Sequence, residues 1–237
     1  MLGTYVNTAI IIIGSLIGLL LKNGLNEKYK ITIMHGVALA VLFIGISTTI
    51  NGMQNGGEPI LFIISLVIGG ILGELIDLDL RLKHLGEMLQ SKVGKGEHNI
   101  AAGFVTASLL FCVGTMAILG SLDSGLRGNH DMLYAKSVLD GVTAIILTST
   151  LGIGVIFSAI SVLVYQGAIT LFAGFLEPYL TTEIIREISI IGGILIFSLG
   201  INMLEIKKIK TANLLPAILI PPLYYLAIVP LIDQIFK

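Results

Sequence analysis

Long apolar runs separated by short polar segments form the main pattern of this chain. The longest run extends from Gly141 to Leu176, which is 36 residues without Asp, Glu, Lys or Arg. A bilayer requires such runs because its hydrocarbon core excludes charge and leaves backbone groups to bond within their own segment. Other windows with no charge, or with one, predict membrane-spanning helices at Gly3–Leu21, Ile31–Ile50, Pro59–Leu75, His98–Leu122, Ile188–Leu204 and Thr211–Ile232.

The apolar stretch from Tyr134 to Pro178 is too long for one span. Its 45 residues would make a helix of roughly 67 Å, about twice the thickness of a hydrocarbon core. We therefore predict two helices with a break near Gly152 and Gly154. The expected fold is an all-α polytopic bundle of about eight spans that forms one membrane domain over residues 1–237.

The basic residues of the predicted loops indicate an orientation. With eight spans, ten of the 14 Lys and Arg residues share one side, which the positive-inside rule assigns to the cytoplasm and which places both termini outside. A seven-span topology divides them nine to five, so span length and not charge favours eight. The ten are Lys22, Lys28, Lys30, Arg81, Lys83, Lys92, Lys95, Lys207, Lys208 and Lys210, and the other four are Arg127, Lys136, Arg186 and Lys237.

Residues 77–99 form the only long polar segment. We expect a short amphipathic helix on the cytoplasmic membrane surface. Its apolar side would carry Leu78, Leu80, Leu82, Leu85 and Leu89.

Two segments resemble each other and suggest an internal repeat. The sequence ITIMHG from Ile31 is similar to ISIIGG from Ile188, and each begins a helix that is followed by a loop and another helix. In an eight-span topology the two segments cross in opposite directions. Spans one to three and six to eight are therefore candidate inverted repeats, although apolar helices also match by chance.

Composition excludes several classes of function. The chain is 55% hydrophobic and 12% charged, with a net charge of −1, which gives no indication of nucleic-acid binding. One cysteine and four scattered histidines predict no metal site. Phosphate-binding loops, dinucleotide fingerprints and a nucleophile–base pair are absent from the sequence, so we expect neither a cofactor nor an enzyme.

Lys136 and Asp140 are the strongest candidates for a functional site. They are four residues apart and so share a helix face, which continues to Thr143. Asp is too short to reach the membrane surface from inside a span, which favours a polar mouth or a binding site. The alternative is an ion pair at the interface that only anchors the helix.

Four further polar residues on predicted spans complete the candidate pathway. Glu74 lies near the cytoplasmic end of the third span, where its carboxylate could bind a proton or cation or reach the headgroups. The others are asparagines, which more often join helices by hydrogen bonds: Asn7, Asn202 and Asn213.

Prolines predict an interrupted last span. Pro216 fits a first helical turn, but Pro221 and Pro222 remove hydrogen bonds near mid-membrane. Backbone carbonyls freed there must face protein or a water-filled cavity, which points to a pathway.

Several of these residues stand in segments that resemble the YqgA/YdfK family, small prokaryotic membrane proteins classed as a domain of unknown function. The resemblance covers nearly the whole chain. It rests on AKSVLD from Ala135, LGIGV from Leu151, Gln166 and NLLPA from Asn213, together with Gly73-Glu74, FCVG from Phe111 and Asn7. It implies a prokaryotic inner-membrane protein with a transport role and supplies no substrate.

These observations lead to one leading hypothesis and one alternative. The leading hypothesis is a transporter or channel for an ion or small polar solute, with Lys136 and Asp140 at its outer mouth and Asn7, Thr143 and the broken last helix along the pathway. The alternative is a membrane scaffold, sensor or subunit of a larger complex. The expected partners are the lipid bilayer and the solute, and self-association is left open.

Overall fold

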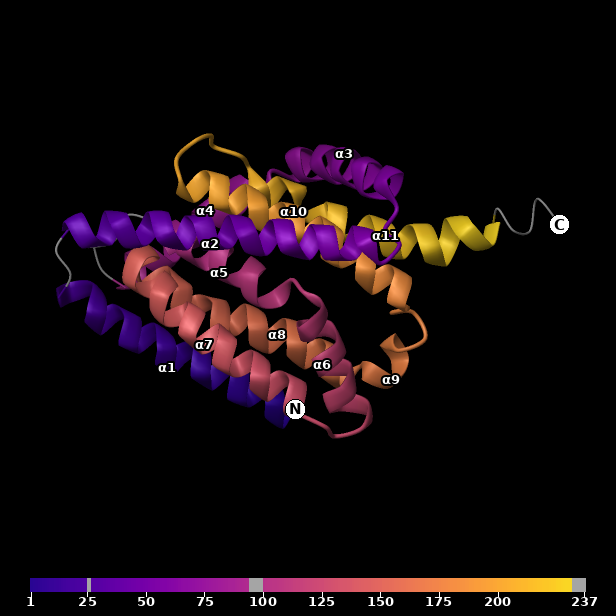
Figure 1. Cartoon of the computed structure of the whole chain (residues 1–237), viewed down its shortest axis with the longest axis horizontal. Coiled ribbons are helices and arrows are strands. Elements are labelled where there is room, and N and C mark those ends of the chain that lie inside the picture. Colours follow the sequence, from indigo (N-terminus) through magenta and orange to yellow (C-terminus); the bar gives the residue numbers. More distant parts are fainter. Residues whose placement is uncertain (25–26, 94–99, 232–237) are drawn as a thin grey trace.

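The computed structural model describes residues 1–24, 27–93 and 100–231, and these residues form helices and loops without a strand. Figure 1 shows an elongated bundle whose long helices run near the long axis. The elements are α1 (Leu2–Gly24), α2 (Glu27–Gln54), α3 (Pro59–Ile76), α4 (Leu78–Val93), α5 (Ile100–Cys112), α6 (Thr115–Leu126), α7 (Asp131–Leu151), η1 (Ile153–Phe157), α8 (Ser158–Leu171), α9 (Ala173–Leu176), α10 (Thr182–Met203), η2 (Thr211–Leu219), α11 (Ile220–Leu223) and the π-helix η3 (Tyr224–Ile228).

Seven helical segments in the described ranges are long and apolar enough to cross a membrane. An eighth crossing is available if α5 and α6, which are bent by 60° at a short break, count as one broken span. The predicted all-α polytopic bundle is therefore confirmed. The bend was not predicted, because the window His98–Leu122 contains no charge and no proline that would mark it.

Helix directions support the eighth crossing. A Cβ added at Gly14 would lie 2.5 Å from the Gly141 carbonyl oxygen, and one added at Gly18 would lie 2.5 Å from the Ile145 carbonyl oxygen. The register therefore advances in the same sense along both helices, so α1 and α7 run parallel. They can do so only if α5–α6 crosses once between α3 and α7. We call the end where α7 and α10 finish the inner end, and the opposite end the outer end.

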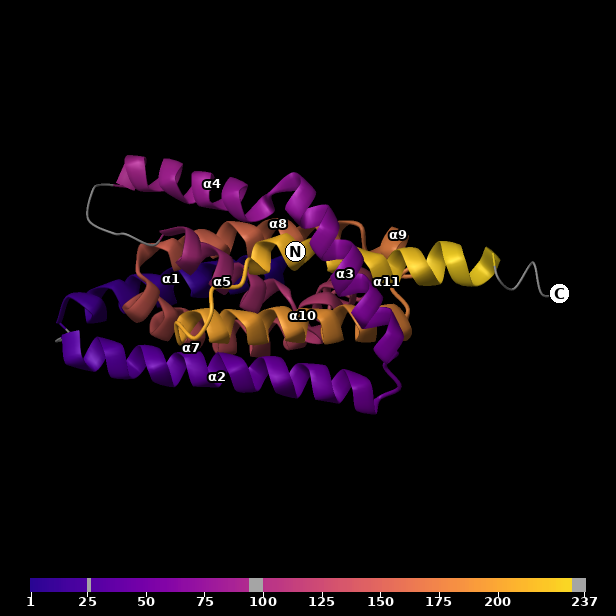
Figure 2. The same cartoon turned by 90° about the horizontal axis from the view of Figure 1, so that it is seen from above.

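Helix α10 is the central element of the other half, and Figures 1 and 2 both show α2 beside it. Of its 22 residues, 14 are buried. Gly45 lies against Phe197, whereas Gly200 lies against Leu42, so the two helices are antiparallel. Glycine at these positions allows the close backbone approach that is typical of helix packing in membranes.

The predicted break after α7 is confirmed. Gly152 ends α7 with a φ of +80°, and the chain continues as the 3-10 helix η1 before α8 begins. Gly154 lies directly against the backbone of Ile100, so a side chain there would collide with the start of α5.

The last span is irregular, as its prolines predict, although it stays helical from Thr211 to Leu231. Pro216 lies inside the 3-10 helix η2, and Pro221 and Pro222 belong to the short helix α11, which continues into the π-helix η3. Each proline removes one N–H donor, and the backbone adopts other hydrogen-bonding patterns around them. In both views this last helical segment extends beyond its neighbours (Figures 1 and 2).

One predicted boundary needs correction, and the predicted surface helix is found. Helix α10 begins at Thr182 and not at Ile188, because the Thr181 side chain accepts a hydrogen bond from the Ile184 backbone and caps a first turn in which Ile184 and Ile185 are buried. The polar segment contains the expected helix, α4, in which Leu80 is exposed and Leu82 is half-buried. The side chains of Leu85 and Leu89, the loop residues 94–99 and the predicted end at Ile232 lie outside the described residues.

Candidate polar site in the bundle

The predicted ion pair between Lys136 and Asp140 is formed, and it is buried. The Lys136 ammonium donates to Asp140 Oδ2, and each residue is only 7% exposed. Asp140 follows nine residues after the start of α7, about 14 Å along the helix axis. The pair therefore lies well inside the bundle, deeper than the outer mouth that the sequence suggested.

Two amides from two other helices complete the site. Asn7 on α1 donates its Nδ2 to Asp140 Oδ2 at 2.9 Å and to Gln166 Oε1 on α8 at 3.3 Å. Both amides are completely buried. We call Asn7, Lys136, Asp140 and Gln166 the central cluster.

The central cluster is not fully hydrogen-bonded. Asn7 Oδ1 and Gln166 Nε2 are buried and have no partner in the described part of the chain. An unpaired buried amide group costs about 1–3 kcal/mol in desolvation. One is an acceptor and the other a donor, so a polar ligand or water between the helices could satisfy both.

Thr143 does not belong to this cluster. It is half-buried, and its hydroxyl donates to the Leu139 carbonyl of its own helix at 2.8 Å. An aromatic ring borders the cluster instead, because the Lys136 ammonium lies 6.0 Å from the centre of the buried Phe111 ring on α5. A cation near an aromatic face gains electrostatic stabilisation in such surroundings.

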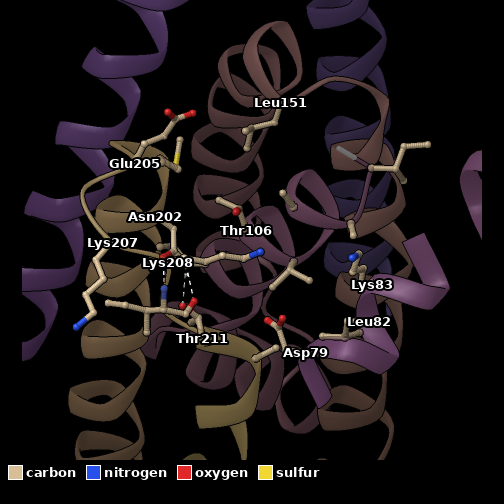
Figure 3. A pocket seen from close by; sticks show the side chains of 18 of the residues that line it. Asp79, Leu82, Lys83, Thr106, Leu151, Asn202, Glu205, Lys207, Lys208 and Thr211 are labelled. Atoms are coloured by element: carbon tan, nitrogen blue, oxygen red, sulfur yellow. Dashed lines mark hydrogen bonds between the residues drawn. The ribbon is translucent and has the colours of Figure 1, made fainter. Parts of the chain in front are cut away.

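A cavity of about 690 Å³ lies at the inner end of the bundle. It extends from the exposed Lys207 and Lys208 in the loop after α10 to the buried Thr106 on α5 and to Leu151 at the end of α7. Figure 3 shows Lys208, Lys83 and Asp79 directed into this space, whereas Lys207 points away from it.

An apolar layer separates the inner cavity from the central cluster. Along α5, Thr106 lines the cavity and Phe111 borders the cluster. Along α7, Leu151 lines the cavity and Asp140 belongs to the cluster, about 16 Å apart along the axis. The buried apolar residues of this region form one group: Ile11, Ala107, Phe111, Ala144, Leu147, Val155, Ala159 and Val162. Thr148 on α7 is also buried between Asp140 and Leu151, and its hydroxyl has no partner in the described part of the chain.

The other candidate residues lie at the inner end and form a separate group. Glu74 accepts hydrogen bonds from Lys210 and, at 2.6 Å, from Asn213 Nδ2. Asn213 Oδ1 accepts from the Asp79 backbone N–H at 2.7 Å. We call Glu74, Lys210 and Asn213 the inner clamp, because it ties η2 to the corner between α3 and α4. The hydrogen bond from Lys210 to Glu74 raises the pKa of this lysine.

Asn202 acts as a clamp of the same kind. Its Nδ2 donates to the Ile209 carbonyl at 2.8 Å, and its Oδ1 accepts from the Ile209 backbone N–H at 2.7 Å. Asn202 therefore closes the loop between α10 and η2, which forms one wall of the inner cavity.

Sequence reasoning missed Glu187, which is completely buried. Its Oε1 accepts from the Glu58 backbone N–H at 3.0 Å and from Arg186 Nε at 3.4 Å, and its Oε2 has no partner among the described residues. Placing the start of the span at Ile188 had left this carboxylate in a loop. Gln166 carried a signal only through the family resemblance, since a single glutamine in an apolar run is otherwise unremarkable.

Within the described residues no group of three or more His, Cys, Asp or Glu side chains is placed to hold a metal ion. The central cluster combines one carboxylate, one ammonium and two amides, with formal charges that cancel. Such a site can exchange a proton or bind a small polar or charged solute by hydrogen bonds and charge.

Fold and site together define a polytopic α-helical membrane protein with a buried charged cluster. The profile of the family described as "Protein of unknown function (DUF554)" matches residues 2–226, and the chain belongs to this family. The "Uncharacterized membrane protein YdfK" of Bacillus subtilis (strain 168) is 44% identical over 222 residues, covering 94% of each chain. The "Uncharacterized protein YqgA" of Escherichia coli (strain K12) is 27% identical over 224 residues, covering 92% of this chain and 94% of its own. No solved structure matches.

Proposed function

We propose that this protein is a transporter or channel for an ion or a small polar solute in a prokaryotic plasma membrane. The observation that carries the proposal is the central cluster. A buried ion pair and two incompletely bonded amides at membrane depth are costly for stability, and such groups commonly serve a transported ion or solute. A simple helix anchor would need neither the amides nor the depth.

The inner cavity supports the same proposal. It gives water and solutes a route from the inner end to the apolar layer, and Asp140 lies about 16 Å from the cavity-lining Leu151 along α7. The substrate pathway would pass from the cavity through this layer to the central cluster. Glu74 and Asn213 belong to the inner clamp and have a structural role in this proposal.

We assign the inner end to the cytoplasm, which places both termini outside, because the loop lysines gather at the inner end. Single cysteines at Asn129 and Lys208 in a Cys112→Ser background test this assignment. An impermeant thiol reagent should label the Asn129 position in intact cells and the Lys208 position only after permeabilisation. The reverse pattern would overturn the orientation.

Flux through proteoliposomes tests transport itself. The purified protein should be screened with protons, Na⁺, K⁺, chloride and small carboxylates, each read with a dye or a labelled tracer. Asp140→Asn should reduce the detected flux to the level of empty liposomes, because it removes the charge while nearly preserving the shape. Thr143→Val is the matched control on the same helix, and its flux should stay that of the unmodified protein.

The result can contradict the proposal in two ways. Unchanged flux in Asp140→Asn would place the pathway elsewhere. Absence of flux for every probe, together with stability that falls in Asp140→Asn and is restored in the double variant Lys136→Met plus Asp140→Leu, would reduce the pair to an anchor.

One observation favours a second candidate, a subunit of a larger membrane complex. The segment after α11 extends beyond the other helices and exposes Leu226, Ile228 and Leu231. Lipid can cover apolar side chains on a span, so it is the extension of this segment beyond the bundle that would give a partner helix or a second copy of the chain a surface to pack on. Crosslinking in native membranes from a cysteine at Leu226 would show either one, and a purely monomeric product would count against this role.

A further inference from the structure

The central cluster lies where the two candidate repeats meet. Thr4 contacts Thr170 and Asn7 contacts Gln166, so α1 and α8 run antiparallel with their polar faces in contact. The sequence similarity described above covers only the second and seventh spans, so it gave no support for pairing α1 with α8 as repeat counterparts.

The other two pairs of helices are antiparallel as well. Gly45 and Gly200 show that α2 and α10 are antiparallel, and Gly73 and Gly69 lie against Asn213 and Ala217 respectively, so α3 and η2 are antiparallel as well. Each helix of the first half, α1–α3, therefore packs against its counterpart in the second half, α8–η2, in the opposite direction. This arrangement is what inverted repeats about a two-fold axis in the membrane plane produce.

The register identifies the position of the axis. Equivalent residues of two repeats touch each other only where the axis passes between them. The similar segments at Ile31 and Ile188 are 157 residues apart, Leu42 contacts Gly200 at a separation of 158, and Asn7 contacts Gln166 at a separation of 159. The nearly constant separation extends to the sequence, because NTAI from Asn7 aligns with QGAI from Gln166.

The remaining crossings fit the same axis. Helix α7 runs parallel to α1, and the broken span α5–α6 runs parallel to α8. Ser108 donates to Ser161 at 2.9 Å, and Gly125, farther along the broken span, lies against Thr170, farther along α8. The α7 crossing and the α5–α6 crossing thus flank the first and second repeats in equivalent ways.

From this arrangement we infer that the protein is a carrier whose single binding site, the amide pair Asn7–Gln166 with Lys136 and Asp140, lies on the repeat axis and opens alternately to the two membrane faces. This inference rests on the proposed transport function and decides between carrier and channel. The described conformation has its cavity at the inner end. Exchanging the conformations of the repeats would close this cavity and open an equivalent one at the outer end.

The axis predicts which residues would line the outer cavity. Met34 and Leu199 line the inner cavity. Their counterparts, 157 residues away in each case, are Ile191 and Leu42, and Ile191 is completely buried in the present conformation. A thiol at Ile191 should therefore react from the outer face only when the repeats exchange conformations.

The test measures this reactivity without a substrate. Ile191→Cys is combined with Val105→Cys, which lines the inner cavity, in the Cys112→Ser background. Membrane vesicles of both orientations expose each face in turn. The Val105 position is first modified from the inner face with a bulky maleimide, which should hold the inner cavity open. The rate at which an impermeant reagent modifies the Ile191 position from the outer face is then measured.

We expect the bulky group to slow this modification at least about tenfold, because it destabilises the conformation that exposes Ile191. Asn129→Cys in the outer loop is the control, and its rate should not change. Leu42→Cys replaces Ile191→Cys under the same criteria if the latter does not fold. No modification from the outer face, or a rate that the bulky group leaves unchanged, would overturn the carrier. Failure of the flux screen alongside coupled reactivity would count against transport and leave the exchange of conformations standing, whereas flux without coupling would indicate a channel.

Discussion

Two clusters of residues combine the same three functional groups, a carboxylate, an ammonium and an amide, in different surroundings. In the central cluster Asp140 binds Lys136 and Asn7, and in the inner clamp Glu74 binds Lys210 and Asn213. The ion pair of the cluster has side chains 8% and 9% exposed, whereas that of the clamp has side chains 51% and 58% exposed.

Hydrogen bonding separates the two groups further. In the inner clamp both ends of the Asn213 amide have partners, which suits a structural fastener. In the central cluster Asn7 Oδ1 and Gln166 Nε2 have none within the described residues. A buried polar atom without a partner calls for a ligand, a water or a functional role to explain it, so the difference favours the central cluster over the inner clamp as the site.

Replacing the lysine of each ion pair should give the largest difference in stability between the two clusters. Lys136→Met leaves a buried carboxylate unpaired and should lower the free energy of unfolding by about 3–5 kcal/mol. Lys210→Met, the matched change at the exposed pair, should have little effect because solvent screens that pair. Thermal unfolding in detergent measures both variants, and equal losses would contradict the comparison.

The glycine contacts that hold α1 against α7 should also stabilise the protein, because these two helices carry three residues of the central cluster. Gly14→Ala would place a methyl group 2.5 Å from the Gly141 carbonyl oxygen and should cost about 1–3 kcal/mol of stability. Gly36→Ala on α2 is the control, since its added Cβ has no neighbour within 4 Å. Chemical denaturation of both variants checks the contact, and a stable Gly14→Ala protein would argue against the tight α1–α7 packing.

Substituting the amides Asn213 and Gln166 separates a role in stability from a role in transport. Asn213→Leu removes a fully bonded amide and should cost about 1–3 kcal/mol without abolishing flux. Gln166→Met removes an amide whose Nε2 is unpaired, so its stability should stay within about 1 kcal/mol while any flux falls. Thermal unfolding and the proteoliposome assay separate the two outcomes. Loss of flux in Asn213→Leu with retention in Gln166→Met would reverse the assignment.

The smallest effect concerns pH at the inner clamp. The hydrogen bond to Glu74 raises the pKa of Lys210 above its ordinary 10.5, so its contribution to stability is complete below that value and is lost only as the pH rises through the raised pKa. The unfolding temperature of Glu74→Gln relative to the unmodified protein should therefore stay constant between about pH 6 and about pH 9. A difference that changes within that window would mean another titrating group acts on the clamp.

Much of the fold could be predicted from the sequence, because charge-free runs report directly on the bilayer. The length of the apolar stretch required a break, and Gly152 and Gly154 indicated its position. The α5–α6 bend could not be predicted, since Gly114 is one of 28 glycines and its φ of +145° appears only in three dimensions. The burial of Glu187 was not predicted, because an acidic residue beside Arg186 is typical of a loop.

The candidate site was predicted in part. Lys136, Asp140 and Asn7 do come together, but Glu74, Asn202 and Asn213 lie in separate contacts at the inner end. Sequence spacing shows which residues share one helix face and not which helices meet, so the contact between Asn7 and Gln166, 159 residues apart, required the structure. The prolines of the last span predicted its irregular backbone because their effect is local.

The bend between α5 and α6 sets a condition on how the protein enters the membrane. The two pieces have 13 and 12 residues, about 20 Å and 18 Å of helix, and neither alone crosses a core of about 30 Å. The backbone groups at the bend must be satisfied by protein or water and not by lipid. This crossing therefore cannot be completed as an independent helix during synthesis, and it has to wait for α10, made later, whose Gly192 lies against Val113 at the bend.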